Sequence, residues 1–217
     1  LESCELSIWR YAPLLAAPDP GFTTTPLHQV GFTPVYQPES LRKSLGMLEL
    51  WIKDESRNPS ASFKDRASAL VMARAIEANF KTIIAASTGN AGAAMACMAA
   101  SVGKQAVIIA PRSAPPAKVA QLLTFGARVV LVDGTYDQAF DLSIEASREL
   151  GWYNRNTGYN PYTVEGKKTA GLEIWEQVLL KREDSAPKLT IFIPVGDGNI
   201  LSGVAKGFAD LQSLGWI

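Results

Sequence analysis

Short apolar runs alternate with helical segments along most of this chain. The apolar runs occupy residues 82–86, 106–110, 127–132 and 189–195, and apolar side chains recur at helical spacing between them. Strands that are apolar throughout are typical of a parallel sheet with both faces covered. Because parallel strands need crossover connections, the alternation predicts an α/β fold with helices on both faces of the sheet.

The same pattern sets the expected boundaries of the elements. An irregular arm over residues 1–47, rich in proline and aromatic residues, precedes a first strand that alternates over 48–53. Helices are expected where apolar residues recur every three or four positions, and paired prolines mark the start of one of them. These helices span residues 65–80, 91–102, 115–126, 138–150, 166–181 and 201–214.

Composition excludes several classes of function. The 217 residues carry 21 Lys and Arg against 21 Asp and Glu, so general electrostatic binding to nucleic acid or to an anionic membrane is not expected. One histidine, His28, and two cysteines, Cys4 and Cys97, are too few for a multi-histidine or cysteine-rich metal site, and we expect no metal. Two distant cysteines and no recognisable secretory leader favour a reducing, cytoplasmic location.

Three turns with unusual chemistry follow predicted strands, where ligands of open α/β sheets bind. The first, residues 60–66 (SASFKDR), places Lys64 at the start of a predicted helix. The positive helix N-terminus disfavours a second positive charge and favours the neutral amine. A neutral lysine is a nucleophile that forms a Schiff base with a carbonyl group. The alternative is a solvated surface lysine, which describes most lysines.

The second turn is STGNAG at residues 87–92, between a predicted strand and a predicted helix. Free backbone N–H groups at the helix start, with the hydroxyls of Ser87 and Thr88, suit a carboxylate or a phosphate. Asn90 offers a neutral amide that can bond a ring oxygen. The alternative is an ordinary helix cap made by Ser87 or Thr88.

The third turn, GDGNILSG at residues 196–203, also connects a predicted strand to a predicted helix. Its glycines let the backbone approach a phosphate, and the helix dipole favours the anion. The third glycine, Gly203, comes five residues after Gly198, which does not fit the dinucleotide fingerprint. A cofactor with one phosphate is therefore favoured over a Rossmann-type module that would bind NAD at these residues.

Together the three turns resemble the pyridoxal-phosphate enzymes of fold type II, the tryptophan-synthase-β group, and among them the threonine synthases. Residues 62–66 resemble the Schiff-base lysine motif, 87–92 the asparagine loop and 194–203 the cofactor-phosphate loop. The likeness extends from about residue 30 to the end of the chain. It includes further family-like segments at 33–34, 51–55, 118–127, 134–137 and 160–169.

The resemblance implies a role for each turn. Lys64 would hold pyridoxal 5'-phosphate through a Schiff base and then shuttle protons, Phe63 would flank the cofactor, and Asn90 would bond its ring hydroxyl. The cofactor's phosphate would be bound by Gly196, Asp197, Gly198, Asn199 and Ile200, and the carboxylate of a small amino-acid substrate by Ser87, Thr88, Gly89 and Ala91. The implied enzyme is a carbon–oxygen lyase acting on phosphate, which converts O-phospho-L-homoserine and water to L-threonine and phosphate.

Two positions depart from the family pattern. Ala61 stands where the family often has glycine. Tyr162 and Thr163 follow Asn160-Pro161, where some members carry an arginine that helps to hold the substrate phosphate; Lys167 or Lys168 could supply that charge. Alternative functions therefore stay open, namely a serine/threonine dehydratase, a cysteine synthase, or a non-catalytic truncated homologue.

The resemblance also implies two lobes of parallel or mixed sheet. Residues 61–155 would form a smaller mobile lobe, and residues 1–60 with 156–217 a larger lobe that holds the cofactor's phosphate. Since family members are longer and this chain stops at Ile217, we expect a C-terminally truncated fragment. The residue that contacts the pyridine nitrogen would then lie beyond Ile217, and the full-length protein is compatible with a homodimer.

Overall fold

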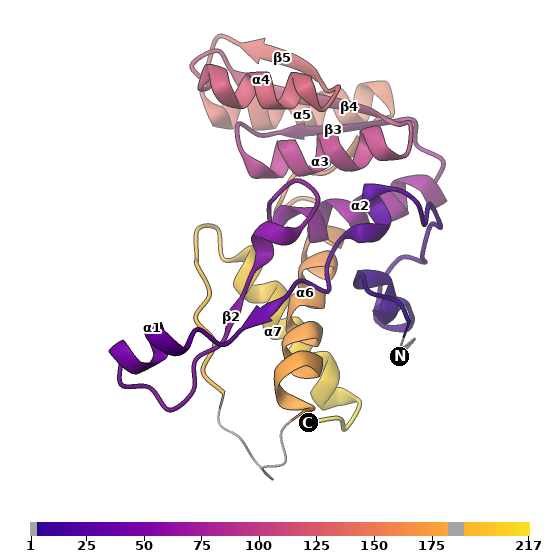
Figure 1. The fold of residues 1–217 in the computed structure, drawn as a ribbon. Coiled ribbons are helices and arrows are strands. Elements are labelled where there is room, and N and C mark those ends of the chain that lie inside the picture. The colour runs from indigo at the N-terminus through magenta and orange to yellow at the C-terminus, as the bar shows by residue number, and fades with distance from the viewer. Residues whose placement is uncertain (1–3, 182–188) are drawn as a thin grey trace.

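A four-stranded parallel sheet forms one end of the molecule (Figure 1). The computed structural model describes residues 4–181 and 189–217. The strands are β3 (Thr82–Ala86), β4 (Gln105–Pro111), β5 (Arg128–Val132) and β6 (Tyr153–Asn154), and their order is β5-β4-β3-β6. Every neighbouring pair in this sheet is parallel, which confirms the predicted α/β class.

Helices cover both faces of this sheet. Because side chains alternate along a strand, Ile83 and Ile108 pack on one face with residues of α3 (Asn90–Ser101) and α4 (Pro116–Thr124). Ile84 and Ile109 pack on the other face with α5 (Tyr136–Leu150). The central strands are apolar throughout because helices cover both of their faces, as the sequence suggests.

The strand order reverses beside β3. The chain runs from β3 through β4 to β5, and then returns to place β6 on the opposite side of β3. Such a reversal opens a crevice at the carboxyl ends of the two strands concerned. β6 was not predicted, because a two-residue strand is too short to show a period of two.

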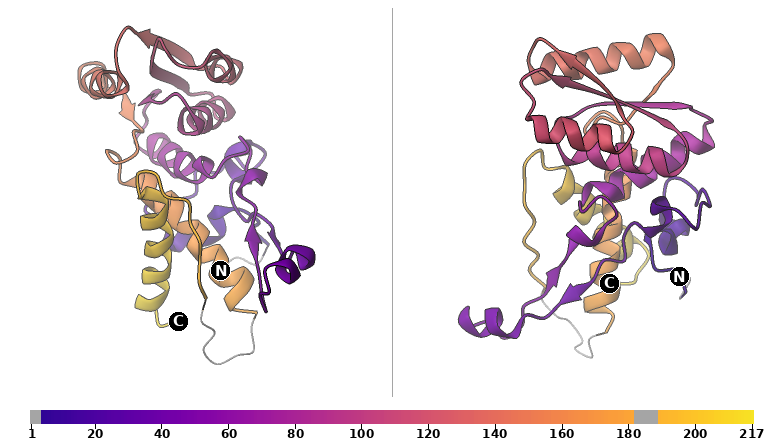
Figure 2. Two further views of the ribbon diagram at one scale, coloured as in Figure 1. Left: turned by 90° about the vertical axis from the view of Figure 1, so that its left-hand side faces the viewer. Right: turned by 45° about the horizontal axis from the view of Figure 1, so that its top comes forward.

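Three helices pack below the sheet. They are α2 (Lys64–Glu77), α6 (Tyr162–Ile174), which continues as one π-helical stretch over Trp175–Leu179, and α7 (Asn199–Ser213). Figure 2 shows α6 and α7 running side by side, away from the sheet. A Cβ at Gly166 would lie 2.2 Å from the backbone oxygen of Arg66, and one at Gly203 would lie 2.5 Å from Cβ of Lys167. Gly203 therefore serves helix packing rather than the turn to which the sequence pattern assigned it.

The arm is more ordered than its sequence suggests. It forms 3-10 turns at Ile8–Leu14 and Pro26–Gln29, helix α1 (Glu39–Ser44), and strand β1 (Val35–Tyr36). β1 pairs antiparallel with β2 (Ile52–Lys53), so only the end of the predicted strand at 48–53 is a strand. A third 3-10 turn, Glu55–Arg57, follows. In the portions of the chain that are described, no helix is long and apolar enough to cross a membrane.

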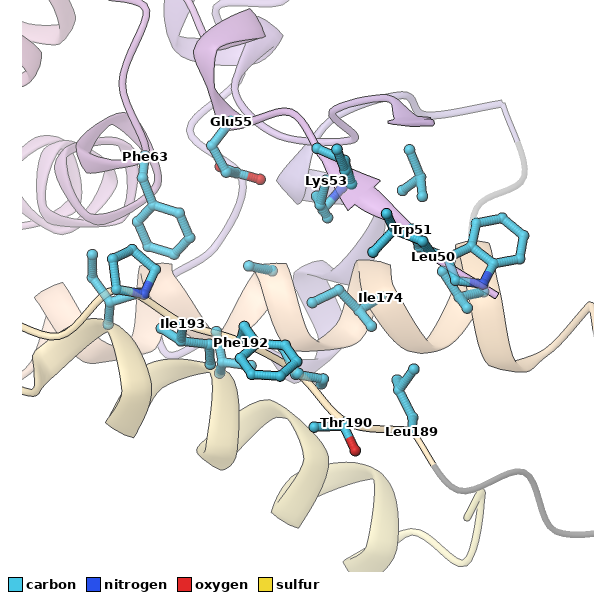
Figure 3. A pocket seen from close by; sticks show the side chains of 18 of the residues that line it. Leu50, Trp51, Lys53, Glu55, Phe63, Ile174, Leu189, Thr190, Phe192 and Ile193 are labelled. Carbon is cyan, nitrogen blue, oxygen red and sulfur yellow. The ribbon is translucent and has the colours of Figure 1, made fainter. Parts of the chain in front are cut away.

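The prediction of a strand at residues 189–195 is wrong. None of the strands in the described ranges pairs with this segment, and 88% of Phe192 is exposed. An extended segment becomes a strand only when a neighbour satisfies its N–H and C=O groups. The segment instead lines a cavity of about 680 Å³ together with β2, α6 and α7 (Figure 3).

A buried ion-pair cluster connects α2, α6 and the β2 region. The guanidinium of Arg66 lies 2.5 Å from the carboxylate of Glu173 and 2.7 Å from that of Glu55. Lys53 Nζ lies 2.7 Å from the second oxygen of Glu173. The side chains of Arg66 and Glu173 are completely buried. This cluster fixes the position of α2, whose first residue is Lys64.

Ala61 has a left-handed backbone, with φ of +56°. This conformation is strained for residues with a Cβ and free of strain for glycine. We expect Ala61→Gly to raise the free energy of unfolding by about 0.5–1 kcal/mol, because relief of strain outweighs the larger chain entropy of glycine. Urea unfolding measures this change. Ala120→Gly, in exposed helix on α4, should lower stability by about 1 kcal/mol; a similar loss at both positions would contradict the strain argument.

Candidate active site

Lys64 is the first residue of α2, as the sequence predicts, and its side chain is partly buried. Its backbone N–H donates to Ser62 Oγ at 3.1 Å. Burial lowers the pKa of the Lys64 amine; the nearby carboxylate of Asp197 opposes this shift and the guanidinium of Arg155 adds to it. The structure therefore favours a more easily deprotonated amine, with burial as the main cause rather than the helix dipole alone.

The third turn lies next to Lys64. Asp197 interacts electrostatically with Lys64, and its Oδ1 accepts the N–H of Asn199 at 3.0 Å. Gly198 has a left-handed φ of +76° and precedes the first residue of α7. Lys167 Nζ donates a hydrogen bond to Asn199 Oδ1. The N-terminus of α7, whose first N–H groups have no partners within the helix, therefore meets two lysines.

Phe63 and Ile200 lie on the side of the apolar cavity. Both line it, together with Pro194 and residues of β2. Figure 3 shows the ring of Phe63 pointing into this cavity, above the segment that contains Phe192 and Ile193. The predicted cofactor residues therefore divide into a charged group around Lys64 and an apolar group facing the cavity.

The second turn forms the start of α3. Ser87 is buried, and its Oγ accepts the N–H groups of Gly92 at 2.9 Å and Gly89 at 3.3 Å, so this hydroxyl caps the start of α3. Thr88 lines a shallow cleft of about 350 Å³ at the end of the sheet. Asn90 is exposed and Ala91 partly buried, and within the described ranges no hydrogen bond or ion pair joins Asn90 to Lys64.

Arg155 is a residue of this region that the sequence reasoning missed. It follows β6 directly and is 1% exposed. Its Nη1 donates to Thr157 Oγ1 at 2.8 Å and its Nε to Ser68 Oγ at 3.3 Å. Its Nη2 has no hydrogen-bond partner among the residues that the structure describes. Burial lowers the pKa of Arg155 to about 10. A signal existed in the sequence, since an arginine between two asparagines follows the apolar pair Trp152-Tyr153.

A network of buried asparagines holds the turn after β6. Asn156 Oδ1 accepts the N–H of Ala86 at 2.8 Å, and Asn156 Nδ2 donates to Ser143 Oγ at 2.6 Å. Asn160 Nδ2 donates to the carbonyl of Asn154 at 2.8 Å. Because buried amides are costly to leave unpaired, these bonds fix the turn that carries Arg155 against the end of β3.

The two adjacent lysines of α6 have different roles. Lys168 Nζ lies 2.7 Å from Glu165 and 2.8 Å from Asp210, so carboxylates neutralise its charge. Burial and the neighbouring cations Arg155 and Lys64 together lower the pKa of Lys167 to about 7, against the opposing effect of Asp197. Lys167, and not Lys168, therefore belongs to the candidate site.

The site has the features that an aldehyde with one phosphate requires. Lys64 offers an amine that deprotonates more easily than a solvated one. Lys64 and Lys167 place two amines beside Asp197, the one carboxylate of the 196–200 turn, which leaves a surplus of positive charge there. Such a surplus suits a phosphate dianion. The residues present therefore fit pyridoxal phosphate.

Comparison with known proteins leads to the same class. Residues 27–215 match the family model described as pyridoxal-phosphate dependent enzyme. The threonine synthase of Methanocaldococcus jannaschii is 34% identical over 218 residues, which cover 100% of this chain and 52% of that protein. The threonine synthase of Methanosarcina acetivorans is 36% identical, over 96% of this chain and 49% of that protein. The chain thus spans about half the length of these curated relatives.

Solved structures share the fold. The processed form of threonine deaminase isoform 2 from Solanum lycopersicum has a TM-score of 0.73 and 27% identity, over 95% of this chain and 53% of that one. Maize serine racemase has a TM-score of 0.72 and 29% identity, over 88% of this chain and 56% of that one. The family match, the parallel sheet and the lysine at the start of α2 agree, and the chain belongs to the pyridoxal-phosphate-dependent enzymes of fold type II.

Proposed function

We propose that this chain carries the active-site lysine and the cofactor-phosphate turn of a threonine synthase, which converts O-phospho-L-homoserine and water to L-threonine and phosphate. The main support is the electrostatic interaction between Lys64 at the start of α2 and Asp197 of the turn before α7, within a group of cations that suits phosphorylated ligands. The two threonine synthases that match 96–100% of the chain at 34–36% identity favour this substrate.

The proposed roles follow from position and chemistry. Pyridoxal phosphate, when bound, supplies a carbonyl group and an electron-withdrawing ring. Lys64 would bond to that carbonyl and, once released, accept and return protons at the substrate's carbon atoms. Phe63 would flank the ring. The cofactor's phosphate would be bound by Gly196, Asp197, Gly198, Asn199 and Ile200.

A movement of the smaller lobe would complete the site. Asn90 would bond the cofactor's ring hydroxyl, and the substrate's carboxylate would be bound by Ser87, Thr88, Gly89 and Ala91. We propose that residues 61–155, which include both Lys64 and Asn90, form a mobile lobe whose closure on the larger lobe excludes water. Residues 1–60 and 156–217 would belong to the larger lobe. A cytoplasmic location and a homodimer complete the proposal.

The direct test compares substrates on the protein as it is naturally encoded, because this chain spans about half of its curated relatives. With pyridoxal phosphate added, O-phospho-L-homoserine should yield threonine and phosphate in equal amounts. Release of 2-oxobutanoate and ammonia from free threonine, without phosphate release from phosphohomoserine, would identify a dehydratase instead. No turnover of either substrate would favour a non-catalytic homologue.

A further inference from the structure

A buried, incompletely paired guanidinium lies where the strand order of the sheet reverses. β3 ends at Ala86 and β6 ends at Asn154, and Arg155 comes directly after β6. Its backbone N–H donates to the carbonyl of Ile84 at 2.8 Å, which fixes the residue against β3. Ligands of doubly wound sheets bind in the crevice at such a reversal. Arg155 is therefore held at the position where the fold itself predicts a ligand.

The hydrogen bonds of Arg155 leave one side of the guanidinium available. Ser68 and Thr157 accept from Nε and Nη1, and neither is charged. Nη2 is buried and has no partner in the described ranges. A buried donor without a partner costs about 1–3 kcal/mol, and more when it is charged. That cost is recovered if an anion accepts from Nη2 when the site is filled.

The charged groups around Arg155 do not neutralise it. Asp197 and Asp65 are the carboxylates that interact with it electrostatically. Asp65 accepts from the backbone N–H of Ser60 at 2.7 Å and from its hydroxyl, and Asp197 accepts from the N–H of Asn199. The cations Lys64 and Lys167 lie close enough to Arg155 for its charge to lower their pKa values. Positive charge is therefore in excess here.

The hydrogen bonds of Arg155 go to elements other than the cofactor-phosphate turn, although Asp197 of that turn lies within electrostatic range. Lys167 bonds Asn199 within that turn, whereas Arg155 bonds Ser68, one helical turn after Lys64 on the same face of α2. Arg155 also interacts electrostatically with Tyr136, whose hydroxyl donates to the carbonyl of Ala86 and which lines the shallow cleft with Thr88. Arg155 thus interacts both with the lysine and with a residue that lines the cleft.

We propose that Arg155 is the specificity-determining residue that binds the phosphate group of the substrate, in a subsite separate from the turn that binds the cofactor's phosphate. This inference rests on the proposed function and assigns its substrate's phosphate to a residue. A guanidinium offers two parallel donors to a phosphate, and Arg155 has Nη2 free for one of them. An unphosphorylated amino acid would leave that donor unpaired and would therefore be disfavoured.

The test uses Arg155→Gln and Arg155→Lys in the naturally encoded protein, loaded with pyridoxal phosphate so that the cofactor turn is filled. Loss of a hydrogen bond to a charged group should raise the KM for O-phospho-L-homoserine by roughly 10- to 100-fold. The Kd of inorganic phosphate, measured by calorimetry, should rise by a similar factor. The Kd of the cofactor, from absorbance titration, should change less than about twofold. The lysine variant should keep part of the affinity for phosphate, because it retains the positive charge but lacks the two parallel donors of a guanidinium.

The control is Arg128→Gln, which removes the same charge from an exposed position on β5 and should leave all three constants unchanged. Thermal melting checks that the variants are folded; if the glutamine variant is not, the lysine variant carries the test. Weaker cofactor binding with an unchanged KM would assign Arg155 to the cofactor's phosphate and overturn the inference. Unchanged constants would overturn it too. A wild-type protein that releases no phosphate would instead overturn the proposed function.

Discussion

Replacing Lys64 with alanine is expected to reduce turnover by at least roughly a thousandfold, because the variant loses both the nucleophile for the cofactor and the group that moves protons. Lys64 is the amine that begins α2, and its partly buried position with a lowered pKa suits both tasks. The measurement is the steady-state rate with each variant saturated in pyridoxal phosphate. Saturation separates the loss of chemistry from a loss of cofactor affinity.

Lys81→Ala is the matched control for this variant. Lys81 is exposed and lies outside the candidate site, so its removal should leave kcat unchanged. Both variants should melt within a few degrees of the parent protein, because Lys81 is exposed and Lys64 is only partly buried. A Lys64→Ala protein that keeps more than a tenth of the parent's kcat would show that another amine performs the chemistry, and Lys167 would then be the first to replace.

Replacing Glu173 with glutamine is expected to lower the free energy of unfolding by about 3–5 kcal/mol, because it leaves the buried Arg66 and Lys53 without their shared carboxylate. Burial opposes ionisation of Glu173, but the two cations outweigh it and lower its pKa to about 2. A lowered carboxyl pKa stabilises the fold above the unfolded value of 4.5, and this contribution is lost as the pH falls towards 2. Urea unfolding at neutral pH measures the change.

Glu77→Gln provides the comparison for this variant. Glu77 pairs with Arg74 on the exposed face of α2, where both side chains are more than a third exposed. Exposed pairs contribute about 0–1 kcal/mol. If the two variants lost the same small amount of stability, the Glu173 cluster would not be the element that positions α2 and its lysine.

Much of the fold could be predicted from periodicity. Apolar runs longer than four residues identified β3, β4 and β5, and the helices α2, α3, α5 and α7 begin within two residues of their predicted starts. β6 was missed because pairing with β3, rather than its own sequence, makes Tyr153–Asn154 a strand. The prediction of a strand at 189–195 failed for the opposite reason, since an apolar sequence without a neighbouring strand to pair with does not form a strand.

The residues of the candidate site could be predicted from the sequence only where they belong to a short, recognisable motif. Lys64 and the glycine turn carry such motifs, and the structure brings Lys64 and Asp197 together. Arg155 and Lys167 have no motif of their own. Their importance comes from burial, from a donor without a partner, and from charges 12 residues apart in sequence that the end of β6 and the middle of α6 bring together. Such long-range placement cannot be obtained from periodicity.

The most direct test of the central claim is to find where the cofactor attaches. The naturally encoded protein is incubated with pyridoxal phosphate, reduced with borohydride, and digested for peptide mapping by mass spectrometry. The account predicts an absorbance band in the visible range before reduction, and a pyridoxyl phosphate mass on the peptide that contains Lys64 and on no other. A protein that takes up no cofactor, or that carries it on Lys167 or another lysine, would contradict the account.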